Sequence, residues 1–234
     1  TRSIAVTGVQ TCALPISAHA HKVAIKQIVK YLKGSLYKDS SGKECICGTF
    51  LNIQCCTSTD TPLSLDMYCD ADFGGLYGFK DSNNPICAHS CTGYVIMLSG
   101  MPIMWQSKLQ TVITSSTAEA ESQALATGMC SLVHLWWVLL EIDRYFHMGI
   151  NPQSLISKVY EDNQAALLTA TADPPCLTPC NKAWAIKIHW YRQWLRKGEI
   201  MILPIPSSDQ TADNLTKPLT HDLFECHRKV LLGW

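Results

Sequence analysis

The chain has 234 residues, of which 47% are hydrophobic and 16% are charged, and its formal net charge is zero. This length allows one generous domain, or one domain with appendages, and it is enough to bury a real hydrophobic core. Without a net charge, any binding to nucleic acid must come from a local basic patch and not from a field over the whole surface.

A membrane-spanning helix is not expected from the apolar runs of the sequence. The best candidate, residues 132–142, is shorter than a bilayer requires and carries His134 and Glu141. We therefore expect a buried helix there and no membrane partner.

Twelve cysteines are many for this length, but their spacing does not give the paired CxxC motifs of a zinc ribbon. Cys87, His89 and Cys91 offer three soft ligands on one short loop, whereas a structural zinc site uses four. Free thiols are the simpler interpretation, and the role of this cluster stays open. Reduced thiols and the lack of a convincing secretory start predict a cytosolic protein.

The first residues, TRSIAVTGVQTCALPIS, form an apolar stretch that polar residues interrupt, which is poor for the hydrophobic region of a signal peptide. The string resembles a translated sequencing adaptor, and we expect residues 1–17 to be a non-native leader. Residues 19–34 have apolar side chains at helical spacing and end at Gly34, a natural C-cap. This amphipathic helix suggests the tail of an upstream domain.

The next segments change from turn-rich to strand-like. Residues 35–44 are rich in turn formers and predict a loop, and residues 45–56 are strand-like. Residues 64–72 alternate polar and apolar side chains, which predicts a half-buried strand. The alternation assigns one set of apolar side chains to the core: Leu65, Met67 and Cys69.

Two further strand patterns, 90–100 and 101–108, meet at Gly100 and predict an antiparallel hairpin. Residues 115–142 begin with Ser and Thr caps and continue with helix formers, which predicts a helix.

The remaining part of the chain alternates strands with helices. Residues 154–171 read as a β-branched strand ending at Glu161 and Asp162, followed by a helix rich in Ala and Leu. A basic, aromatic helix (181–198), a short strand (199–206) and a capped helix start (208–219) follow. Strands that first pair antiparallel and then alternate with helices predict an α/β fold with a mixed sheet.

Four acidic residues occupy similar places in these elements. Asp70 and Asp162 end predicted strands, Glu121 lies in the first turns of a helix, and Asp213 lies in the capped start of the last segment. Functional groups collect at such places in open α/β sheets, and adjacent strands would bring Asp70 and Asp162 together. A single Asp after a strand is nevertheless more often a turn or helix cap.

Carboxylates that lie within a few ångströms of one another cannot all stay ionised unless a cation joins them. Hard oxygen ligands suit Mg²⁺ or Mn²⁺ better than zinc. Two such ions about 4 Å apart can hold a phosphodiester, activate a water and stabilise the leaving oxygen. The acidic set therefore predicts two-metal phosphodiester hydrolysis.

Several motifs occur in the order expected for a known family: DADFGG, CTGYVIMLSGMPIMWQSKLQTVITSSTAEAESQALA, YEDNQAAL, RKGEI and TADNLTKPL. They resemble the ribonuclease H domain of Copia-type LTR retrotransposon Pol polyproteins, over roughly Lys22 to Gly233, and SSTAEAE and ADNLTKPL are the most specific. The resemblance implies a ribonuclease H-like α/β fold, with a mixed five-stranded sheet of three antiparallel and then two parallel strands, flanked by helices. Residues 18–60 would be the tail of a reverse transcriptase or connection segment, and residues 61–234 the ribonuclease H-like domain.

The resemblance also implies a function, namely endonucleolytic hydrolysis of the RNA strand of RNA–DNA hybrids during reverse transcription, with two Mg²⁺ or Mn²⁺ ions. Asp70 would bridge both ions, Glu121 and Asp162 would complete one site, and Asp213 would help to hold the other. Asp72 and Glu119 would be supporting or solvated residues. The implied partners are the hybrid and an upstream reverse transcriptase domain, and the implied location is a cytoplasmic virus-like particle.

Substrate contacts are predicted from exposed polar residues and from the basic helix at 181–198. That helix combines cationic and aromatic side chains and contains no acid, which fits phosphate contacts on one face, although a solvated face over an aromatic core fits as well. Contacts to 2′-hydroxyls would select RNA. A histidine in that helix could assist product release or proton transfer, or could simply be packed. The predicted nucleic-acid-binding residues are Ser116, Thr117, Asn163, Lys182, Lys187, His189 and Arg192.

Two departures from the family pattern keep other hypotheses open. Ala183 stands where the family has a histidine, and Ser122 stands where it has a bulky residue. These departures suit an inactive relic or a hybrid-binding module of the same fold, whereas the four intact acids favour an active nuclease. An integrase-like or resolvase nuclease on a related fold is a third hypothesis, against which the TADNLTKPL motif argues.

Overall fold

The structure is a computed structural model of the chain. It describes residues 63–77, 83–147, 155–172 and 182–232, together with Lys26 and two short strands at 36–38 and 44–46. The predicted leader, most of the predicted helix at 19–34 and most of the predicted connection segment lie outside the described residues.

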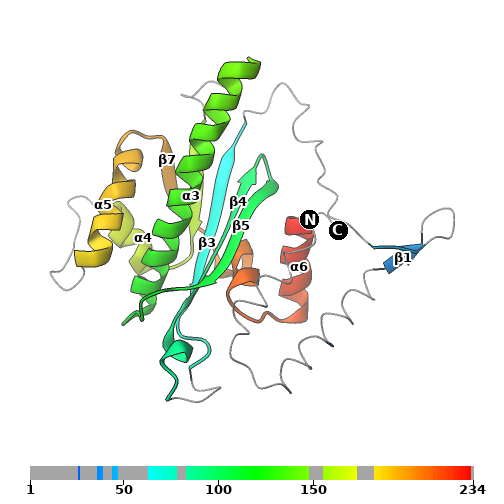
Figure 1. Ribbon diagram of the computed structural model, residues 1–234, viewed down its shortest axis with the longest axis vertical. Helices are drawn as coiled ribbons and strands as arrows, with labels where there is room; N and C mark the ends of the chain where they lie inside the picture. The colour runs from blue at the N-terminus through cyan, green and yellow to red at the C-terminus, as the bar shows by residue number, and fades with distance from the viewer. Residues whose placement is uncertain are drawn as a thin grey trace.

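A five-stranded sheet forms the centre of the fold, with strand order β5-β4-β3-β6-β7 (Figure 1). The strands are β3 (Leu65–Asp72), β4 (Cys91–Leu98), β5 (Met101–Leu109), β6 (Ser157–Glu161) and β7 (Ile200–Pro204). β3, β4 and β5 pair antiparallel, whereas β6 pairs parallel with both β3 and β7. This arrangement confirms the predicted mixed sheet of three antiparallel and two parallel strands.

The helices cover the two faces of this sheet unequally. α3 (Thr117–Phe146), α4 (Gln164–Thr171) and α5 (Lys182–Arg196) lie on one side, and α6 (His221–Leu232) lies on the other with the short 3₁₀ helix η5 (Thr211–Leu215) (Figure 1). α3 packs on β3 and β4, and η5 packs on the same two strands. The end of β3 is therefore covered from both sides.

The main core lies between the sheet and α3. Leu65, Met67 and Cys69 are fully buried in it, as the alternation of β3 predicted. Leu125 and Met129 meet them from α3. Each such buried side chain contributes roughly 1.5–3 kcal/mol relative to an exposed one.

α3 begins where its capping residues predict. The Ser116 hydroxyl accepts a hydrogen bond from the Glu119 amide at 3.2 Å, and the Glu119 carboxylate accepts one from the Ser115 amide at 2.8 Å. The first bond satisfies an amide that the first helical turn leaves unpaired, and the second holds the residue before the N-cap. The helix ends at His147, which adopts the left-handed conformation with φ of 52°.

The length of α3 corrects one expectation from the sequence. Among the described helices, α3 is long and apolar enough to cross a membrane by length and composition, a test that core helices of soluble proteins also pass. The apolar run at 132–142, predicted to be buried, is only partly so, because Trp137 and Val138 are more than half exposed. The first half of the helix, with small residues such as Ala120 and Ala124, is more deeply buried. This first half packs on the sheet in the structure.

Two other segments differ from their predictions. Residues 35–44 were predicted as a loop, but β1 (Leu36–Lys38) pairs antiparallel with β2 (Glu44–Ile46). Residues 208–219 were predicted as a helix start, but they contain the 3₁₀ turns η4 (Ser207–Asp209) and η5. Pro218 keeps an α-helix from running through the end of this segment, because the residue before a proline is disfavoured in the α conformation.

Candidate metal centre

Three carboxylates from separate parts of the chain converge at the end of β3. Asp70, Glu121 and Asp162 each offer a ligand oxygen, and these oxygens lie within 4.8 Å of one another. Asp70 is in β3, Glu121 is in the first turns of α3, and Asp162 directly follows β6. Parallel pairing of β3 with β6 explains why the two aspartates meet, because it brings their carboxyl ends to one edge.

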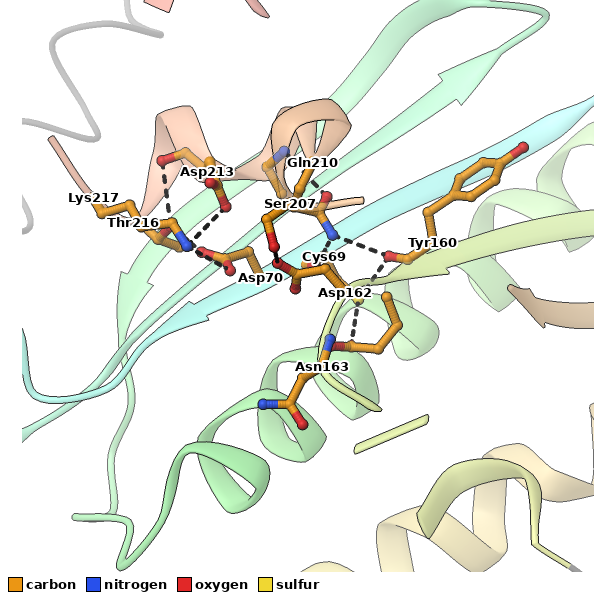
Figure 2. Close-up of polar contacts among 12 residues, drawn as sticks. Cys69, Asp70, Tyr160, Asp162, Asn163, Ser207, Gln210, Asp213, Thr216 and Lys217 are labelled. Atoms are coloured by element: carbon orange, nitrogen blue, oxygen red, sulfur yellow. Dashed lines mark hydrogen bonds and ion pairs between the residues drawn. The ribbon is translucent and has the colours of Figure 1, made fainter. Parts of the chain in front are cut away.

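Asp70 is buried although it lies on the face of β3 opposite the main core. Its residue exposure is only 1%, because η5 and the residues after it cover that face. The Thr216 hydroxyl donates to Oδ2, and the Lys217 ammonium lies 3.2 Å from Oδ1 (Figure 2). Both oxygens of a buried carboxylate thus have partners, as burial of a charge requires.

A glycine opposite Asp70 allows η5 to pack closely against the sheet. Gly93 is the cross-strand partner of Asp70 on β4. A Cβ atom at this position would lie 2.6 Å from Thr216 Cγ2 and 3.2 Å from the carbonyl oxygen of Ala212. The absence of a side chain at Gly93 therefore sets the distance between β4 and the segment that covers Asp70.

Glu121, and not Glu119, is the helix acid of this site, as the resemblance implied. Burial raises the pKa of Glu121 to about 10, and the neighbouring Glu161 and Asp70 add to the shift, whereas a backbone hydrogen bond from Ala71 opposes it. Its Oε2 atom is buried without a hydrogen-bond partner. Such an oxygen, aimed among other carboxylates, is a ready ligand for a cation.

Asp162 is oriented by a hydrogen bond from a residue that follows β7. The Ser207 hydroxyl donates to Asp162 Oδ2 at 2.8 Å (Figure 2). The next residue, Asn163, caps α4, because its Oδ1 atom accepts hydrogen bonds from the amides of Ala165 and Ala166 at 3.0 Å each. The amide oxygen of Asn163 is thus used within the protein, while its predicted contact with nucleic acid stays a prediction.

Asp213 lies beside the three clustered carboxylates and faces Asp70 across a lysine. The Lys217 ammonium is 3.0 Å from Asp213 Oδ1 and 3.2 Å from Asp70 Oδ1 (Figure 2). Burial and the nearby Asp70 raise the pKa of Asp213 to about 7, although Lys217 opposes the shift. The sequence analysis missed Lys217, and the signal for it was the lysine four residues after Asp213 in the motif TADNLTKPL.

A glutamine holds together the two strands that carry the aspartates. The pairing of β3 with β6 covers Met67 and Tyr68 of β3 and does not extend to Asp70. The Gln210 side-chain amide donates to the carbonyl oxygens of Cys69 at 2.9 Å and Tyr160 at 3.4 Å (Figure 2). Gln210 thereby satisfies carbonyl oxygens of both strands just before the two aspartates. No sequence motif indicated this role.

A further buried carboxylate supports the site from the core. Glu161 accepts a hydrogen bond from the Asn163 amide at 3.0 Å and lies 3.5 Å from Cys69 Sγ. Burial raises the pKa of Glu161 to about 8, and the Asn163 hydrogen bond opposes that shift. The sequence analysis noted Glu161 only as the end of a strand.

These side chains fit a divalent cation that prefers oxygen ligands. The donors are carboxylate oxygens, two of the three clustered acids are buried, and Glu121 carries an oxygen without a hydrogen-bond partner. Mg²⁺ and Mn²⁺ match this donor set. Three of the four predicted acids thus meet in one place, whereas Asp213 lies outside this group and faces Asp70 across the Lys217 ammonium. Their roles in binding metal stay a prediction.

The predicted nucleic-acid-binding residues fall into different environments. Ser116 and Thr117 are exposed at the start of α3, and Lys187 and His189 are exposed on α5. The side chain of Lys182 lies outside the described residues.

The prediction for Arg192 is wrong. Its residue exposure is 4%, and its Nη2 atom donates to the carbonyl oxygen of Ala172 at the end of α4. A guanidinium buried between helices cannot reach a phosphate without disrupting the packing of α5. The charge pattern of α5 did not show this burial because arginine usually marks an exposed face.

The cysteine–histidine loop does not form a metal-binding group in the described part of the chain. His89 Nδ1 lies 2.7 Å from the carbonyl oxygen of Gln110, and Cys91 Sγ lies 3.6 Å from Ser107 Oγ. Cys87 is buried in a short 3₁₀ turn. Among the cysteines that the structure describes, none forms a disulfide.

No protein-family model matches the chain. The retrovirus-related Pol polyprotein from transposon RE2 of Arabidopsis thaliana is 30% identical over 205 residues, which are 88% of this chain and 12% of that protein. The corresponding polyprotein from transposon TNT 1-94 of Nicotiana tabacum is 29% identical over 212 residues, or 90% of this chain and 13% of that protein. The chain thus spans about an eighth of the length of the curated relatives that it matches.

Solved structures of ribonucleases H also resemble the chain. A ribonuclease H1 isolated from compost by a metagenomic approach has a TM-score of 0.43 and 17% identity, over 65% of this chain and 92% of that one. The N-terminal ribonuclease H domain of a Mycobacterium tuberculosis protein has a TM-score of 0.44 and 13% identity, over 71% of this chain and 97% of that one.

The sheet order and the carboxylates gathered at the ends of β3 and β6 agree with the predicted ribonuclease H-like fold. Over nearly its whole length the chain is similar to one segment of the retrovirus-related Pol polyproteins of Copia-type transposons. The resemblance indicated by its sequence motifs is therefore confirmed.

Proposed function

We propose that this domain hydrolyses the RNA strand of RNA–DNA hybrids endonucleolytically, with Mg²⁺ or Mn²⁺, during reverse transcription of a retrotransposon. The observation that carries the proposal is the convergence of Asp70, Glu121 and Asp162, with ligand oxygens within 4.8 Å of one another. Like-charged groups this close favour a divalent cation, and their position at strand ends suits a substrate that binds across the sheet edge.

The acids have distinct roles in the proposed two-metal mechanism. Asp70, Glu121 and Asp162 would hold one ion, and Asp70 together with Asp213 would hold the second. When bound, the ions supply a Lewis acid for the phosphodiester and for the water that attacks it.

The protein prepares these ligands before substrate arrives. Thr216 fixes one oxygen of Asp70, and Ser207 fixes one oxygen of Asp162 at 2.8 Å. Gln210 holds the strand ends from which the two aspartates project. Ligands fixed in this way need little reorganisation when they bind a cation, which favours both affinity and catalysis.

Proton release accompanies metal binding in this proposal. The pKa of Asp213 is raised to about 7 and that of Glu121 to about 10, mainly by burial. Because a carboxylate must lose its proton to ligate a metal, metal affinity should increase as the pH rises.

Substrate recognition would use the exposed polar residues near the start of α3 and on α5. Ser116 and Thr117 precede Glu121 by about one helical turn and could contact 2′-hydroxyls, which distinguish RNA from DNA. Lys187 and His189 are exposed and could contact phosphates. The proposed partners are the hybrid and the upstream reverse transcriptase domain of the polyprotein, in a cytoplasmic virus-like particle.

Cleavage of a labelled RNA–DNA hybrid by the full chain tests the proposal. We expect Mg²⁺- or Mn²⁺-dependent cutting of the RNA strand alone, and loss of at least about a hundredfold in rate in Asp70→Asn, because one metal ligand is neutralised. Asp222→Asn is the matched control, since Asp222 is an exposed aspartate at the start of α6. No cutting by the folded chain would instead favour an inactive, hybrid-binding module of the same fold.

A further inference from the structure

We propose that the Lys217 ammonium occupies the second cation position, between Asp70 and Asp213, so that without substrate the domain binds a single divalent ion. A second ion would enter only after this ammonium moves. The inference rests on the proposed metal centre and deepens it, because it states how many ions the protein binds by itself and which residue controls the second.

The geometry carries the inference. Lys217 Nζ lies 3.2 Å from Asp70 Oδ1 and 3.0 Å from Asp213 Oδ1, and it joins the two carboxylates that the second ion would share (Figure 2). Asp70 also contributes to the group with Glu121 and Asp162. The centre is thus divided into one position formed by acids alone and one position where an ammonium already neutralises two acids.

The Lys217 ammonium and a divalent ion cannot occupy this second position together, because both are positively charged. A divalent ion bridging Asp70 and Asp213 would lie beside the ammonium in a largely buried site, where repulsion between cations is poorly screened. Lys217 must therefore leave before such an ion binds. The first position has no such competitor, because no lysine or arginine in the described part of the chain is recorded in an ion pair with Glu121 or Asp162.

The backbone of Lys217 is fixed, whereas its side chain can move. The Lys217 amide donates to the carbonyl oxygen of Asp213 at 3.1 Å, and Thr216 is packed against the position of Gly93. The Lys217 side chain is nevertheless 39% exposed. The ammonium could therefore turn from the carboxylates toward an incoming phosphodiester, whose negative charge attracts it, and so vacate the second position as substrate binds.

A purely structural role makes a different prediction. If Lys217 only ties η5 to the sheet, its removal would lower stability and leave the number of bound ions unchanged. If it occupies a cation position, its removal would add a binding site for metal. The two interpretations are separated by counting ions, without any measurement of nuclease activity.

Mn²⁺ titration of the full chain, in the absence of nucleic acid, is the test, with free Mn²⁺ counted by electron paramagnetic resonance. We expect one bound ion in the wild type and two in Lys217→Met, the second binding at least about tenfold more tightly than any second event in the wild type. Lys217→Arg should keep the count at one, because it retains the charge. Lys229→Met, at an exposed position on α6, is the matched control and should behave as the wild type.

Equal ion counts and affinities in the wild type and folded Lys217→Met would overturn the inference. If Lys217→Met does not fold, wild-type protein mixed with a 2′-O-methyl RNA–DNA hybrid provides a second measurement, in which the count should rise from one to two. An unchanged count with bound hybrid would also overturn it. Failure of the wild type to bind Mn²⁺ in a manner sensitive to Asp70→Asn would reject the proposed metal centre itself, a result distinct from failure of the Lys217 inference.

Discussion

Asp70 lies near the end of β3, whose apolar side chains point into the main core, yet it is itself buried with partners for both carboxylate oxygens. Alternation along β3 places Asp70 on the opposite face, as the sequence indicated. The sequence did not indicate that Thr216 and Lys217, which are distant from Asp70 in the chain, cover that face. Burial of Asp70 is therefore a property of the fold, although its position on the strand is a property of the sequence.

Gly93 provides a prediction at the scale of one residue. In Gly93→Ala the new Cβ would lie 2.6 Å from Thr216 Cγ2 and 3.2 Å from the backbone oxygen of Ala212, so η5 must shift away from β4. We expect a loss of about 1–3 kcal/mol in the free energy of unfolding, measured by urea denaturation, and weaker Mn²⁺ binding.

Gly128→Ala is the control for this substitution. Its Cβ would meet mainly the flexible side chain of Met67, and alanine favours the α3 helix in which it lies. Unchanged metal affinity in Gly93→Ala would contradict the role assigned to the packing of η5.

At the scale of elements, α5 shows how a charge pattern can mislead. The helix is basic along its length, but Arg192 faces the protein and joins α5 to the end of α4 through the carbonyl oxygen of Ala172. Lys187 and His189 are exposed on the same helix. Only the packing of α5 shows which basic side chains are buried and which are exposed, because basic residues occur in both environments.

Substitutions on α5 should therefore separate stability from binding. Arg192→Met should lower the free energy of unfolding by about 2 kcal/mol, because it leaves the partly buried Ala172 carbonyl without its donor. Lys187→Met should leave stability almost unchanged and weaken hybrid binding, with a smaller dependence of affinity on salt. Thermal melts and hybrid titrations at several salt concentrations measure both. The opposite pattern, with Arg192 affecting binding alone, would argue against its buried role.

At the scale of the whole molecule, the fold gathers acids from β3, α3, β6 and η5 against one another. Burial raises the pKa of Asp213 to about 7 and that of Glu121 to about 10, above their ordinary values of 3.8 and 4.5. Between the ordinary and the raised values the folded state binds more protons than the unfolded state. Stability should therefore fall as the pH rises through this window.

Thermal melts in EDTA test this pH dependence. We expect the Tm to decrease from pH 5 to pH 9, by an amount on the order of 5 °C, because the acids lose protons while no cation replaces them. Mg²⁺ should restore much of the loss at the higher pH, since it binds the folded state preferentially. Glu121→Gln should flatten the profile in EDTA, and a steep profile in that variant would contradict the assignment.

The sequence by itself determined the order of the five sheet strands and of the helices between them, the caps of α3, the hairpin at Gly100 and the four acids, because alternation, capping residues and motifs are local signals. Only the tertiary structure decided that Arg192 is buried, that Gln210 joins β3 to β6, and that Lys217 stands between Asp70 and Asp213. These features depend on contacts between residues far apart in the chain. A local pattern gives the type and spacing of side chains, whereas packing decides which of them share a site.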